Sequence, residues 1–493
     1  MSRKSDTSRR GFLAATALSC GQILTNRAFG VLKSSGAASS RPVRVVIDAT
    51  RTMGAIPPDF TGLGFEISSV ATDNLLTAAN RTYVQLVRTL GKRGVVRVGG
   101  NTSDYSMFRP QAKLRSTPKG TIINRESLNR LGSFLDATGW QLIWGLNLGS
   151  GTTQDAIEQA RVVAGVVKDK LLAFEIGNEP DLFVHEGHRP HGYSYENYLE
   201  DYRRFKSALR AALPGVPLAG PDVAGDNEWV KRFAKDEGSD LKLLTHHYYR
   251  GGASNPASTL DLLLHGDPKL ASTLATLRQI SEQAHLPFRI CETNSFSGGG
   301  KPGVSNTFGS ALWMLDYMLT VAWGGGSGVN IETGVNQLDF TSSYSPIHDD
   351  GKGGYSAAPD YYGMLAFARA GRGEKLALDY DPGPINLTAY ATLQDQRRIA
   401  VTIVNKDASQ DAEVEIIAKQ HPARANAMRL VGPSLGSQQG VTFAGAAVAS
   451  NGTWQPANVE SIRLRENSGT ISVPAGSAVV VIVDMVDADG SRE

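Results

Sequence analysis

Residues 171–183 read LLAFEIGNEPDLF, and this stretch decides the fold. Its apolar first half is typical of a strand buried on both faces, as in a parallel sheet. Gly177 and Pro180 break the pattern, so Glu179 falls at the carboxyl end of the strand. In a parallel α/β barrel, catalytic residues lie at that end. Glu179 is therefore either a proton donor, with Asn178 beside it to bind a substrate hydroxyl, or an acid that caps the next helix.

Apolar runs and helical patterns alternate along the middle of the chain, which indicates an α/β fold. The expected strands are 62–67, 94–100, 141–148, 171–178, 217–223, 241–249, 287–294 and 326–333. The expected helices include 80–90, 154–167, 195–212, 271–284 and 308–321. Eight strands are the number of a closed (β/α) TIM barrel, which we place at 55–370.

A different pattern follows the barrel. From about residue 371 onward, short alternating runs are separated by turn residues and no helical period is visible. We expect residues 371–493 to form an all-β sandwich domain. The stretch 43–50 comes before the barrel but resembles those later strands, so we expect it to join the same sandwich.

The N-terminus is typical of an exported protein. Residues 8–13 read SRRGFL, a twin-arginine pattern with a short apolar run after it. We expect a signal peptide at 1–30, a spacer at 31–42, and a periplasmic or secreted enzyme. Losing 1–30 changes the formal net charge from +2 to −2, which argues against a nucleic-acid partner. If Cys20 is removed with the signal peptide, Cys291 has no cysteine to pair with, so we expect no disulfide within the chain. We also expect no membrane span, because no later segment is apolar enough.

A second acid ends the seventh expected strand. Residues 288–294 read FRICETN and place Glu292 there. Glu179 and Glu292 would then face each other across one barrel mouth. Paired carboxylates across a cleft are typical of glycoside hydrolysis, where one protonates the leaving oxygen and the other attacks the anomeric carbon or activates water.

Several stretches together resemble glycoside hydrolase family 79, the β-glucuronidase and heparanase group of clan A. They are GLGFE at 62–66, RVGGNT at 97–102, EIGNEP at 175–180, HHYY at 246–249 and ETNS at 292–295. The resemblance implies a retaining exo-β-glycosidase that hydrolyses β-glucuronosides, with Glu179 as acid/base, Glu292 as nucleophile and about 5 Å between them. It also implies that Glu66, Asn101 and Asn178 bind the terminal sugar, and no cofactor or metal is expected.

Two alternatives remain open at this point. One is another clan A β-glycosidase, such as a β-xylosidase or β-glucosidase. The other is a non-catalytic carbohydrate-binding protein on the same scaffold. The sequence does not indicate the aglycone or the oligomeric state.

The sixth strand can face the pocket in two ways. Alternation along a strand separates His246 and Tyr248 from His247 and Tyr249. The resemblance selects His246 and Tyr248 as the inward pair, with the Tyr248 hydroxyl on the nucleophile. Simple aromatic packing in the barrel is the alternative.

Arg97 stands in an otherwise apolar strand, and a buried arginine needs a carboxylate partner. Glu292 would be a functional partner that keeps the nucleophile ionised, and Glu175 a structural one. Both partners remain open.

A glycine run follows the nucleophile strand. Gly298, Gly299 and Gly300 can turn backbone N–H groups toward an anion, and Lys301 adds positive charge. A glucuronate carboxylate is such an anion, although Ser297 stands where the family commonly has a tyrosine. We expect Tyr344 to close the pocket after the eighth strand.

Three histidines, His185, His188 and His191, follow Glu179 at a spacing of three. They do not form an H-E-x-x-H zinc pattern, and the Gly and Pro among them favour a loop. We expect this loop to line the leaving-group side of the cleft rather than to hold a metal.

Overall fold

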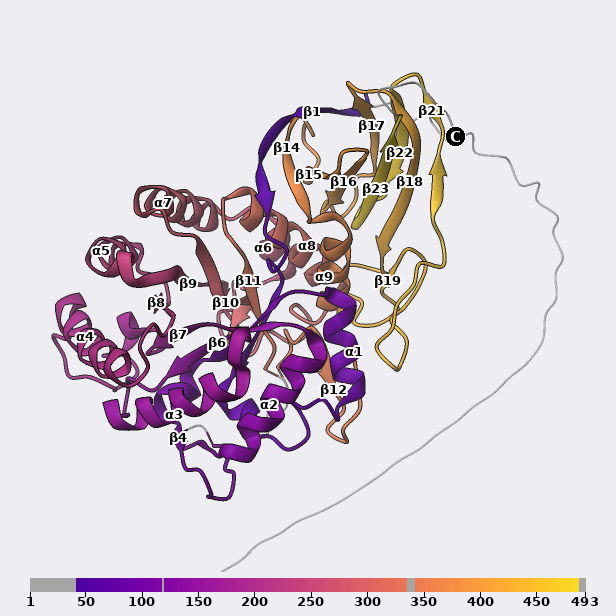
Figure 1. The fold of residues 1–493 in the computed structure, drawn as a ribbon. Helices are drawn as coiled ribbons and strands as arrows, with labels where there is room; N and C mark the ends of the chain where they lie inside the picture. The colour runs from indigo at the N-terminus through magenta and orange to yellow at the C-terminus, as the bar shows by residue number, and fades with distance from the viewer. Residues whose placement is uncertain (1–40, 118, 335–341, 487–493) are drawn as a thin grey trace, which may run out of the picture. The chain divides into compact units, whose positions relative to one another are not determined.

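The computed structural model describes residues 41–117, 119–334 and 342–486. The predicted signal peptide at 1–30 and nearly all of the predicted spacer lie outside these residues. The described residues from Pro42 onward belong to one compact unit, which contains a barrel and a β-sheet domain (Figure 1).

Eight parallel strands close into a barrel, which confirms the predicted fold class. Each strand falls within a few residues of its expected range, because buried parallel strands are apolar on both faces and easily distinguished from helices. In barrel order they are β10 (Phe288–Ser297), β11 (Val329–Glu332), β2 (Gly62–Glu66), β3 (Val95–Gly99), β6 (Gln141–Leu146), β7 (Leu171–Ile176), β8 (Leu218–Val223) and β9 (Leu241–Gly252).

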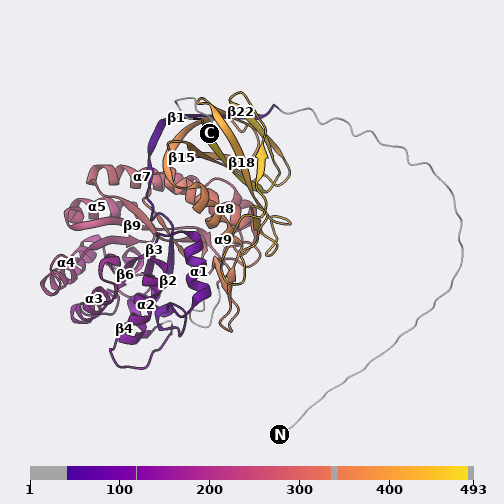
Figure 2. The same cartoon turned by 45° about the vertical axis from the view of Figure 1, so that its right-hand side comes forward.

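Helices surround the barrel strands (Figure 2). Several begin at residues that cap them. The Asn80 side chain accepts from the Tyr83 N–H, and Asn124 and Ser127 form a capping box. The helices are α1 (Arg81–Leu90), α2 (Arg125–Thr138), α3 (Thr153–Val167), α4 (Tyr195–Ala212), α5 (Asn227–Glu237), α6 (Leu260–Leu264), α7 (Pro268–Ala284), α8 (Phe308–Trp323) and α9 (Pro359–Ala370).

Short elements occupy the connections between these strands and helices. Two small sheets are formed by β4 (Met107–Phe108) with β5 (Ile122–Ile123) and by β12 (Ile347–Asp349) with β13 (Tyr355–Ala357). The single-turn helices are η1 (Ile67–Ala71), η2 (Asn101–Tyr105), η3 (Lys168–Lys170), η4 (Pro180–Leu182) and η5 (Gly238–Asp240). Of these, η1, η2 and η4 follow barrel strands directly and shape the mouth of the barrel.

The C-terminal strands form one continuous sheet rather than two separate ones. Strand β1 (Val43–Ile56) lies in it, antiparallel to β14 and parallel to β17. Buried residues from both halves of the sheet, such as Val414 and Val481, share one core, so the halves face each other as in a sandwich. The other strands are β14 (Gly373–Tyr380), β15 (Leu387–Asp395), β16 (Arg398–Asn405), β17 (Ala412–Ala418), β18 (Pro422–Val431), β19 (Thr442–Phe443), β20 (Glu460–Ile462), β21 (Leu464–Arg465), β22 (Ser468–Val473) and β23 (Ser477–Met485).

Helix α8 joins the two parts, and nearly all of its side chains are buried. Its Asp316 accepts hydrogen bonds from Thr388 and Tyr390 of β15 and from the Lys406 ammonium at 2.5 Å. Because Lys406 and Asp316 are both largely shielded from water, breaking this pair would leave a charge unpaired at high cost. The barrel therefore rests on the β-sheet domain through specific polar contacts as well as apolar ones.

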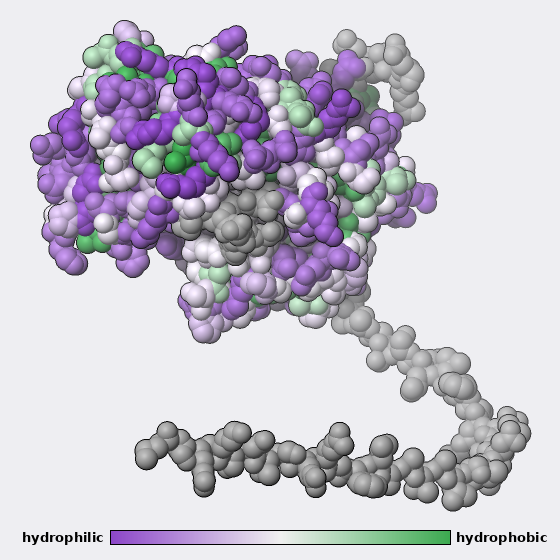
Figure 3. Space-filling view, turned by 90° about the horizontal axis from the view of Figure 1, so that it is seen from below, coloured by the Kyte–Doolittle hydropathy of each residue, from purple (hydrophilic) through white to green (hydrophobic). Residues whose placement is uncertain are grey.

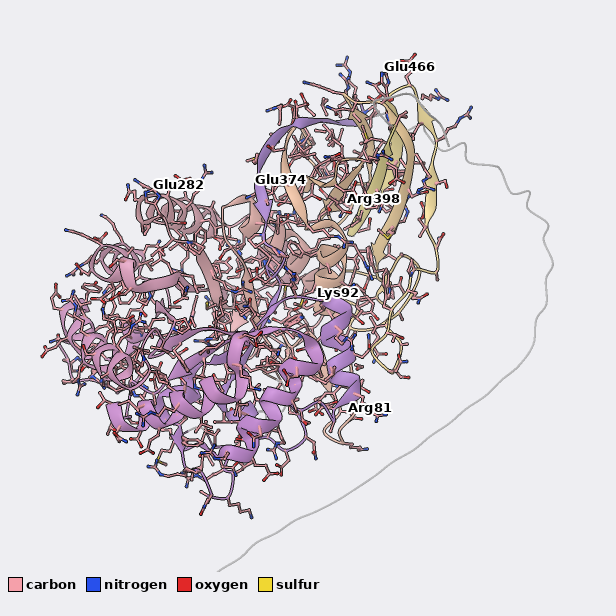
Figure 4. All side chains as sticks on the ribbon, viewed as in Figure 1. Arg81, Lys92, Glu282, Glu374, Arg398 and Glu466 are labelled. Atoms are coloured by element: carbon pink, nitrogen blue, oxygen red, sulfur yellow. The ribbon has the colours of Figure 1, made fainter. Side chains whose placement is uncertain are left out.

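The surface is polar. The face seen in Figure 3 is mostly hydrophilic, with scattered hydrophobic side chains. Figure 4 shows labelled charged side chains on both parts, for example Glu282 on α7 and Arg398 on β16. Among the described residues, the exposed large apolar side chains are Met53, Val459 and Val486. No described helix combines the length and the apolar character needed to cross a membrane.

Candidate active site

A pocket of about 460 Å³ lies at the carboxyl ends of the barrel strands. Its lining contains four carboxyl groups, which is the composition that acid–base chemistry requires. The lining residues are Glu66, Asn101, Glu179, Leu182, Ala224, Tyr249, Gly251, Lys269, Glu292, Ser297, Gly298, Gly299, Glu332 and Tyr344. A larger cleft of about 660 Å³ is lined in part by Arg88, Lys92 and Trp454, but by no acid, so we place the chemistry in the first pocket.

Glu179 and Glu292 lie close together in this pocket. Within the group Glu179, His247 and Glu292, one ligand atom from each residue lies within 4.8 Å of the other two. Retaining glycosidases have their carboxyls about 5–5.5 Å apart, whereas inverting enzymes leave roughly 6.5–9.5 Å for a water molecule. The separation therefore favours direct attack by one carboxylate.

The backbone turns sharply to present Glu179. Gly177 and Glu179 both have positive φ, 86° and 50°, and the Glu179 N–H donates to the Asp222 carbonyl at 2.8 Å. A left-handed conformation is costly for a residue with a side chain, and such strain is frequent at active sites. Glu179 therefore leaves the strand at an angle that turns its carboxyl toward the pocket.

His247 connects Glu179 to the barrel interior. Its Nδ1 lies 2.9 Å from Glu179 Oε1 and its Nε2 lies 2.8 Å from Asp222 Oδ1. Burial would lower the pKa of His247, but the Asp222 and Glu292 charges and these hydrogen bonds raise it well above its ordinary value. Both ring nitrogens therefore carry protons, and they donate to Asp222 and to an oxygen of the Glu179 carboxyl group.

Glu179 has the titration behaviour of a proton donor. Burial raises the pKa of Glu179 above its ordinary value, and the Glu292 charge adds to this rise. The hydrogen bond from His247 and its positive charge act in the opposite direction. The net rise favours a protonated carboxyl before the reaction starts.

Two donors hold the Glu292 carboxyl group. Arg97 Nη1 donates to its Oε2 at 2.7 Å, and the Tyr249 hydroxyl donates to its Oε1 at 2.9 Å. Because each oxygen has its own donor, the carboxyl group is fixed in one orientation. A fixed orientation is what a nucleophile needs.

Arg97 contacts both of the carboxylate partners, Glu292 and Glu175, that the sequence left open. It donates to Glu292, and its Nε donates to Glu175 Oε2 at 3.1 Å. Its Nη2 also donates to Asp222 Oδ2 at 2.5 Å and to the side-chain oxygen Oδ1 of Asn178 at 2.8 Å. One buried guanidinium therefore orients Glu292 and neutralises acids of the barrel interior at the same time.

The predicted inward pair on the sixth strand is wrong. Tyr249 lines the pocket and donates to Glu292, and His247 contacts Glu179. Tyr248 instead donates to Asp267 at 2.5 Å and stacks on Tyr317. Both ring nitrogens of His246 are buried without a hydrogen-bond partner among the described residues. The cause lies in the register with the neighbouring β10, where Ile290 pairs with His246 but Glu292 pairs with His247, so that Cys291 forms an irregularity.

Three predicted sugar-binding residues form one group. Glu66 accepts from the backbone N–H of Asn101 at 3.1 Å and from that of Thr102 at 2.7 Å. The Asn178 amide donates to the Asn101 side-chain oxygen at 3.0 Å. Burial raises the pKa of Glu66 to about 7, with the Glu292 charge adding to the rise. Glu66 and Asn101 line the pocket, and Asn178 supports them from behind.

Comparison with known proteins agrees with this geometry. Residues 385–480 match the family model for the glycosyl hydrolase family 79 C-terminal beta domain. A β-glucuronidase of Aspergillus niger is 26% identical over 71% of this chain and 69% of its own length. A β-glucuronidase of Neurospora crassa is 28% identical over 66% of each chain, slightly less than two thirds, and bovine heparanase is 28% identical over 56% of this chain and 52% of its own length. The chain is therefore similar to glycoside hydrolase family 79, and these matches support a glycosidase.

Solved structures share the fold of this chain. The 4-O-α-L-rhamnosyl-β-D-glucuronidase of Fusarium oxysporum superposes with a TM-score of 0.72, at 17% identity, over 88% of this chain and 99% of that one. A GH51 arabinofuranosidase of Xanthomonas axonopodis superposes with a TM-score of 0.66, at 16% identity, over 90% of this chain and 100% of that one. At such identities the likeness concerns the fold alone.

The structure changes part of the prediction for the carboxylate-binding loop. Gly298 and Gly299 line the pocket, both with positive φ. Lys301 does not, because its backbone N–H donates to Ser305 Oγ and its ammonium donates to the Asn255 carbonyl at 3.2 Å. The cation in the pocket lining is Lys269 at the start of α7, which the sequence analysis missed because nothing in the sequence relates that helix to the mouth.

Tyr344 lies where it was expected. It is 5% exposed, lines the pocket and stacks on Tyr249 with ring centroids 6.3 Å apart. The backbone of Tyr344 is fixed by Asn294, whose side-chain amide donates to the Tyr344 carbonyl at 3.1 Å.

Two acids were missed by the sequence analysis. Asp222 is the second-last residue of β8, and Arg97 and His247 outweigh its burial and lower its pKa to about 2. Glu332 ends β11 and lines the pocket. Both follow the rule that located Glu179, an acid at the end of an apolar strand, and that rule applied to every strand would have found them.

The histidine loop does not reach the described pocket lining. His188 packs on Tyr105 and Phe183, with ring centroids 4.5 and 5.0 Å away, and burial lowers its pKa. Among the described residues, the two groups of ligands close enough for a metal are Glu175, Asp222 and Cys291, and Glu179, His247 and Glu292. The second group suits a metal poorly, because both nitrogens of His247 already face carboxylates.

Proposed function

We propose that this glycosidase hydrolyses β-glucuronosides with retention of configuration, through a covalent glycosyl-enzyme intermediate. The observation that carries the proposal is the close approach of Glu179 and Glu292, within 4.8 Å, with a protonating environment around the first and two donors on the second. The relatives named β-glucuronidase support the substrate class.

In the first step, a Glu292 oxygen attacks the anomeric carbon and the glycosidic C–O bond breaks. The leaving oxygen takes the proton of Glu179, so that a glycosyl ester and the free aglycone are formed. His247 holds Glu179 Oε1 with its Nδ1–H, which leaves the other oxygen of Glu179 to carry the transferred proton.

In the second step, Glu179 becomes the base. The Glu292 charge contributes to the raised pKa of Glu179, and this charge disappears when Glu292 is esterified. The positive charge of His247 then acts on Glu179 with less opposition, and the carboxylate form is favoured. Glu179 takes a proton from water, the water oxygen attacks the anomeric carbon, and the ester bond breaks to release Glu292 and a β-configured product.

Recognition of the uronate is proposed for the side of the pocket formed by Gly298, Gly299 and Tyr344. A carboxylate left without donors in a closed pocket would cost several kcal/mol, so a pocket that accepts one must offer N–H or O–H groups. Ser297 lines the same region and offers a shorter donor than a tyrosine would. Lys269 adds a positive charge to the lining.

The test is hydrolysis of nitrophenyl β-glucuronide, β-glucoside and β-xyloside by the mature enzyme. We expect the glucuronide to be preferred by about ten- to a thousand-fold in kcat/KM, and Ser297→Tyr to widen the gap. NMR of the first product should show the β-anomer. A glucoside cleaved as fast as the glucuronide would favour another clan A β-glycosidase, and hydrolysis of none of the three would favour a carbohydrate-binding protein.

We also propose that the enzyme acts outside the cytoplasm. The twin arginines Arg9 and Arg10, with the apolar run after them, are the support for this. When both arginines are replaced with lysine, we expect the glycosidase activity in the cytoplasmic fraction. With the unchanged chain, we expect that activity in the periplasm or the medium.

A further inference from the structure

Glu332 is an acid in the pocket that the steps above do not use. It is the last residue of β11, its side chain lines the pocket, and it is 3% exposed. The neighbouring Gly64 makes room for it, since a Cβ at that position would lie 2.5 Å from Glu332 Oε2. The backbone therefore accommodates this carboxyl group inside the sugar-binding region.

Neither oxygen of Glu332 is hydrogen-bonded within residues 41–117, 119–334 and 342–486. The backbone of Gly334 lowers the pKa of Glu332, but burial and the neighbouring acids raise it by more. By contrast, Glu66 accepts from Thr102 and Asn101, and Glu292 accepts from Arg97 and Tyr249. A buried carboxylate without donors is unfavourable, so the neutral acid is the stable form.

The charges around Glu332 act in the same direction. Burial, then the Glu292 charge on β10 and the Glu66 charge on β2, raise the pKa of Glu332 well above its ordinary value. Arg97 on β3 lowers it but is already engaged by other acids. The other titratable groups that interact with Glu332 are the hydroxyls of Tyr249 on β9, Tyr344 after β11 and Tyr83 on α1.

We propose that Glu332 stands in the pocket as a neutral carboxylic acid, donates its proton in a hydrogen bond to the carboxylate of the glycone, and thereby makes the preference for a uronic acid depend on pH. This inference rests on the proposed β-glucuronidase function and adds a specificity-determining residue to it. No bond is made or broken in this contact: Glu332 keeps its proton while the uronate accepts the hydrogen bond.

The physical reason is charge. The pocket lining contains four carboxyl groups and one lysine, so a pocket with every acid ionised would repel an anionic glycone. A neutral Glu332 removes one of those charges and supplies a donor instead. When Glu332 ionises, the donor is lost and a repulsion appears, whereas a neutral sugar such as glucose is affected much less.

The experiment measures the ratio of kcat/KM for nitrophenyl β-glucuronide to that for nitrophenyl β-glucoside, from about pH 5 to about pH 9. The ratio cancels the ionisation of Glu179 and Glu292, because both substrates need them equally. We expect the wild-type ratio to fall at least about tenfold as the pH rises. Glu332→Gln keeps the size and a donor but cannot ionise, so its ratio should stay flat within about threefold.

Glu282→Gln is the matched control. It makes the same Glu-to-Gln substitution at an exposed site on α7 (Figure 4), and its ratio should follow the wild type. A flat wild-type ratio, or a Glu332→Gln ratio that falls like the wild type, would overturn the inference while the glucuronide remains a substrate. Failure of the proposed function would look different, because the wild type would not prefer the glucuronide at any pH.

A second measurement does not depend on the variant folding. Binding of free glucuronate to the wild type can be followed by calorimetry in buffers of different ionisation enthalpy, at a pH where the wild-type ratio has already fallen. There the free enzyme has an ionised Glu332, so binding of glucuronate should take up a proton as Glu332 becomes neutral. Glucose should bind without this uptake. Equal proton uptake for the two sugars would count against Glu332 as the donor.

Discussion

Replacing Tyr249 with phenylalanine should slow catalysis without unfolding the enzyme. The Tyr249 hydroxyl donates to Glu292 Oε1 at 2.9 Å, and Arg97 donates to the other oxygen at 2.7 Å. A hydrogen bond to a charged group contributes about 1.5–3 kcal/mol, which corresponds to roughly a 10- to 150-fold loss in kcat/KM. Because Arg97 still holds Oε2, we do not expect the larger cost of an unpaired buried charge.

Tyr248 is the matched control for this prediction. It is the adjacent residue, but its hydroxyl donates to Asp267 on the outside of the barrel. Tyr248→Phe should change kcat/KM by no more than about threefold, less than 1 kcal/mol.

Both variants should be assayed on the preferred nitrophenyl glycoside, with circular dichroism melting to confirm the fold. Equal losses in the two variants, or a loss confined to Tyr248→Phe, would refute the assignment of Tyr249 to the nucleophile.

Three further predictions concern the acid, the β-sheet domain and stability. Glu179→Ala should slow glycosides with poor leaving groups far more than activated ones, because an activated aglycone needs no proton; equal loss on both would remove Glu179 from the acid role. Truncation after Arg372 should give insoluble protein, since it removes β14 and β17 and leaves β1 unpaired; soluble, active protein would disprove this. Burial lowers the pKa of His246 to about 4, so as the pH falls the unfolded chain is protonated at this histidine before the folded chain is. The free energy of unfolding should therefore decrease as the pH falls from about 6.5 to about 4, by up to roughly 3 kcal/mol. His246→Gln should flatten that part of a plot of melting temperature against pH, and an unchanged slope would assign the effect to other groups.

The barrel could be predicted from the sequence because its signal is local. Each parallel strand is buried on both faces, so a run such as Leu171–Ile176 is apolar at successive positions, and helices with visible caps separate the runs. The rule that catalytic groups lie at the carboxyl ends of barrel strands then located Glu179 and Glu292. Neither step requires knowledge of which residues touch.

The orientation of the sixth strand could not be predicted in the same way. A strand has two faces, and alternation alone leaves His246 with Tyr248 and His247 with Tyr249 equally acceptable. The choice depends on one irregularity at Cys291 in the next strand, where the register with β9 shifts between Ile290 and Glu292. No residue type in this stretch marks the irregularity, so it is visible only in the pairing of the strands in the structure.

The prediction that Lys301 contributes its charge to the pocket failed for a related reason. A glycine run with a lysine after it is consistent with an anion site, but the path of the loop depends on contacts made elsewhere. Gly300 donates to the Phe296 carbonyl at 3.0 Å and Lys301 to Ser305, which turns the lysine toward the Asn255 carbonyl. Lys269 enters the lining instead from a helix more than twenty residues earlier, a proximity that only the closed barrel creates.

The charges around Arg97 and His247 support the proposed acid role of Glu179. In this cluster, Arg97 and His247 are the two cations, and Glu175, Glu179, Asp222 and Glu292 are the four acids that contact them. Two cations can neutralise two anions, so two of the acids should hold protons.

The contacts determine which two acids these are. Asp222 is bound by both cations, and its pKa falls to about 2. Glu292 receives Arg97 and the Tyr249 hydroxyl, whereas burial raises the pKa of Glu175 to about 7 and also raises that of Glu179. Of the two protonated acids, Glu175 is fully buried, and Glu179 lines the pocket. A substrate can therefore take a proton from Glu179 alone of this pair, while Glu175 supports the arginine that orients the nucleophile.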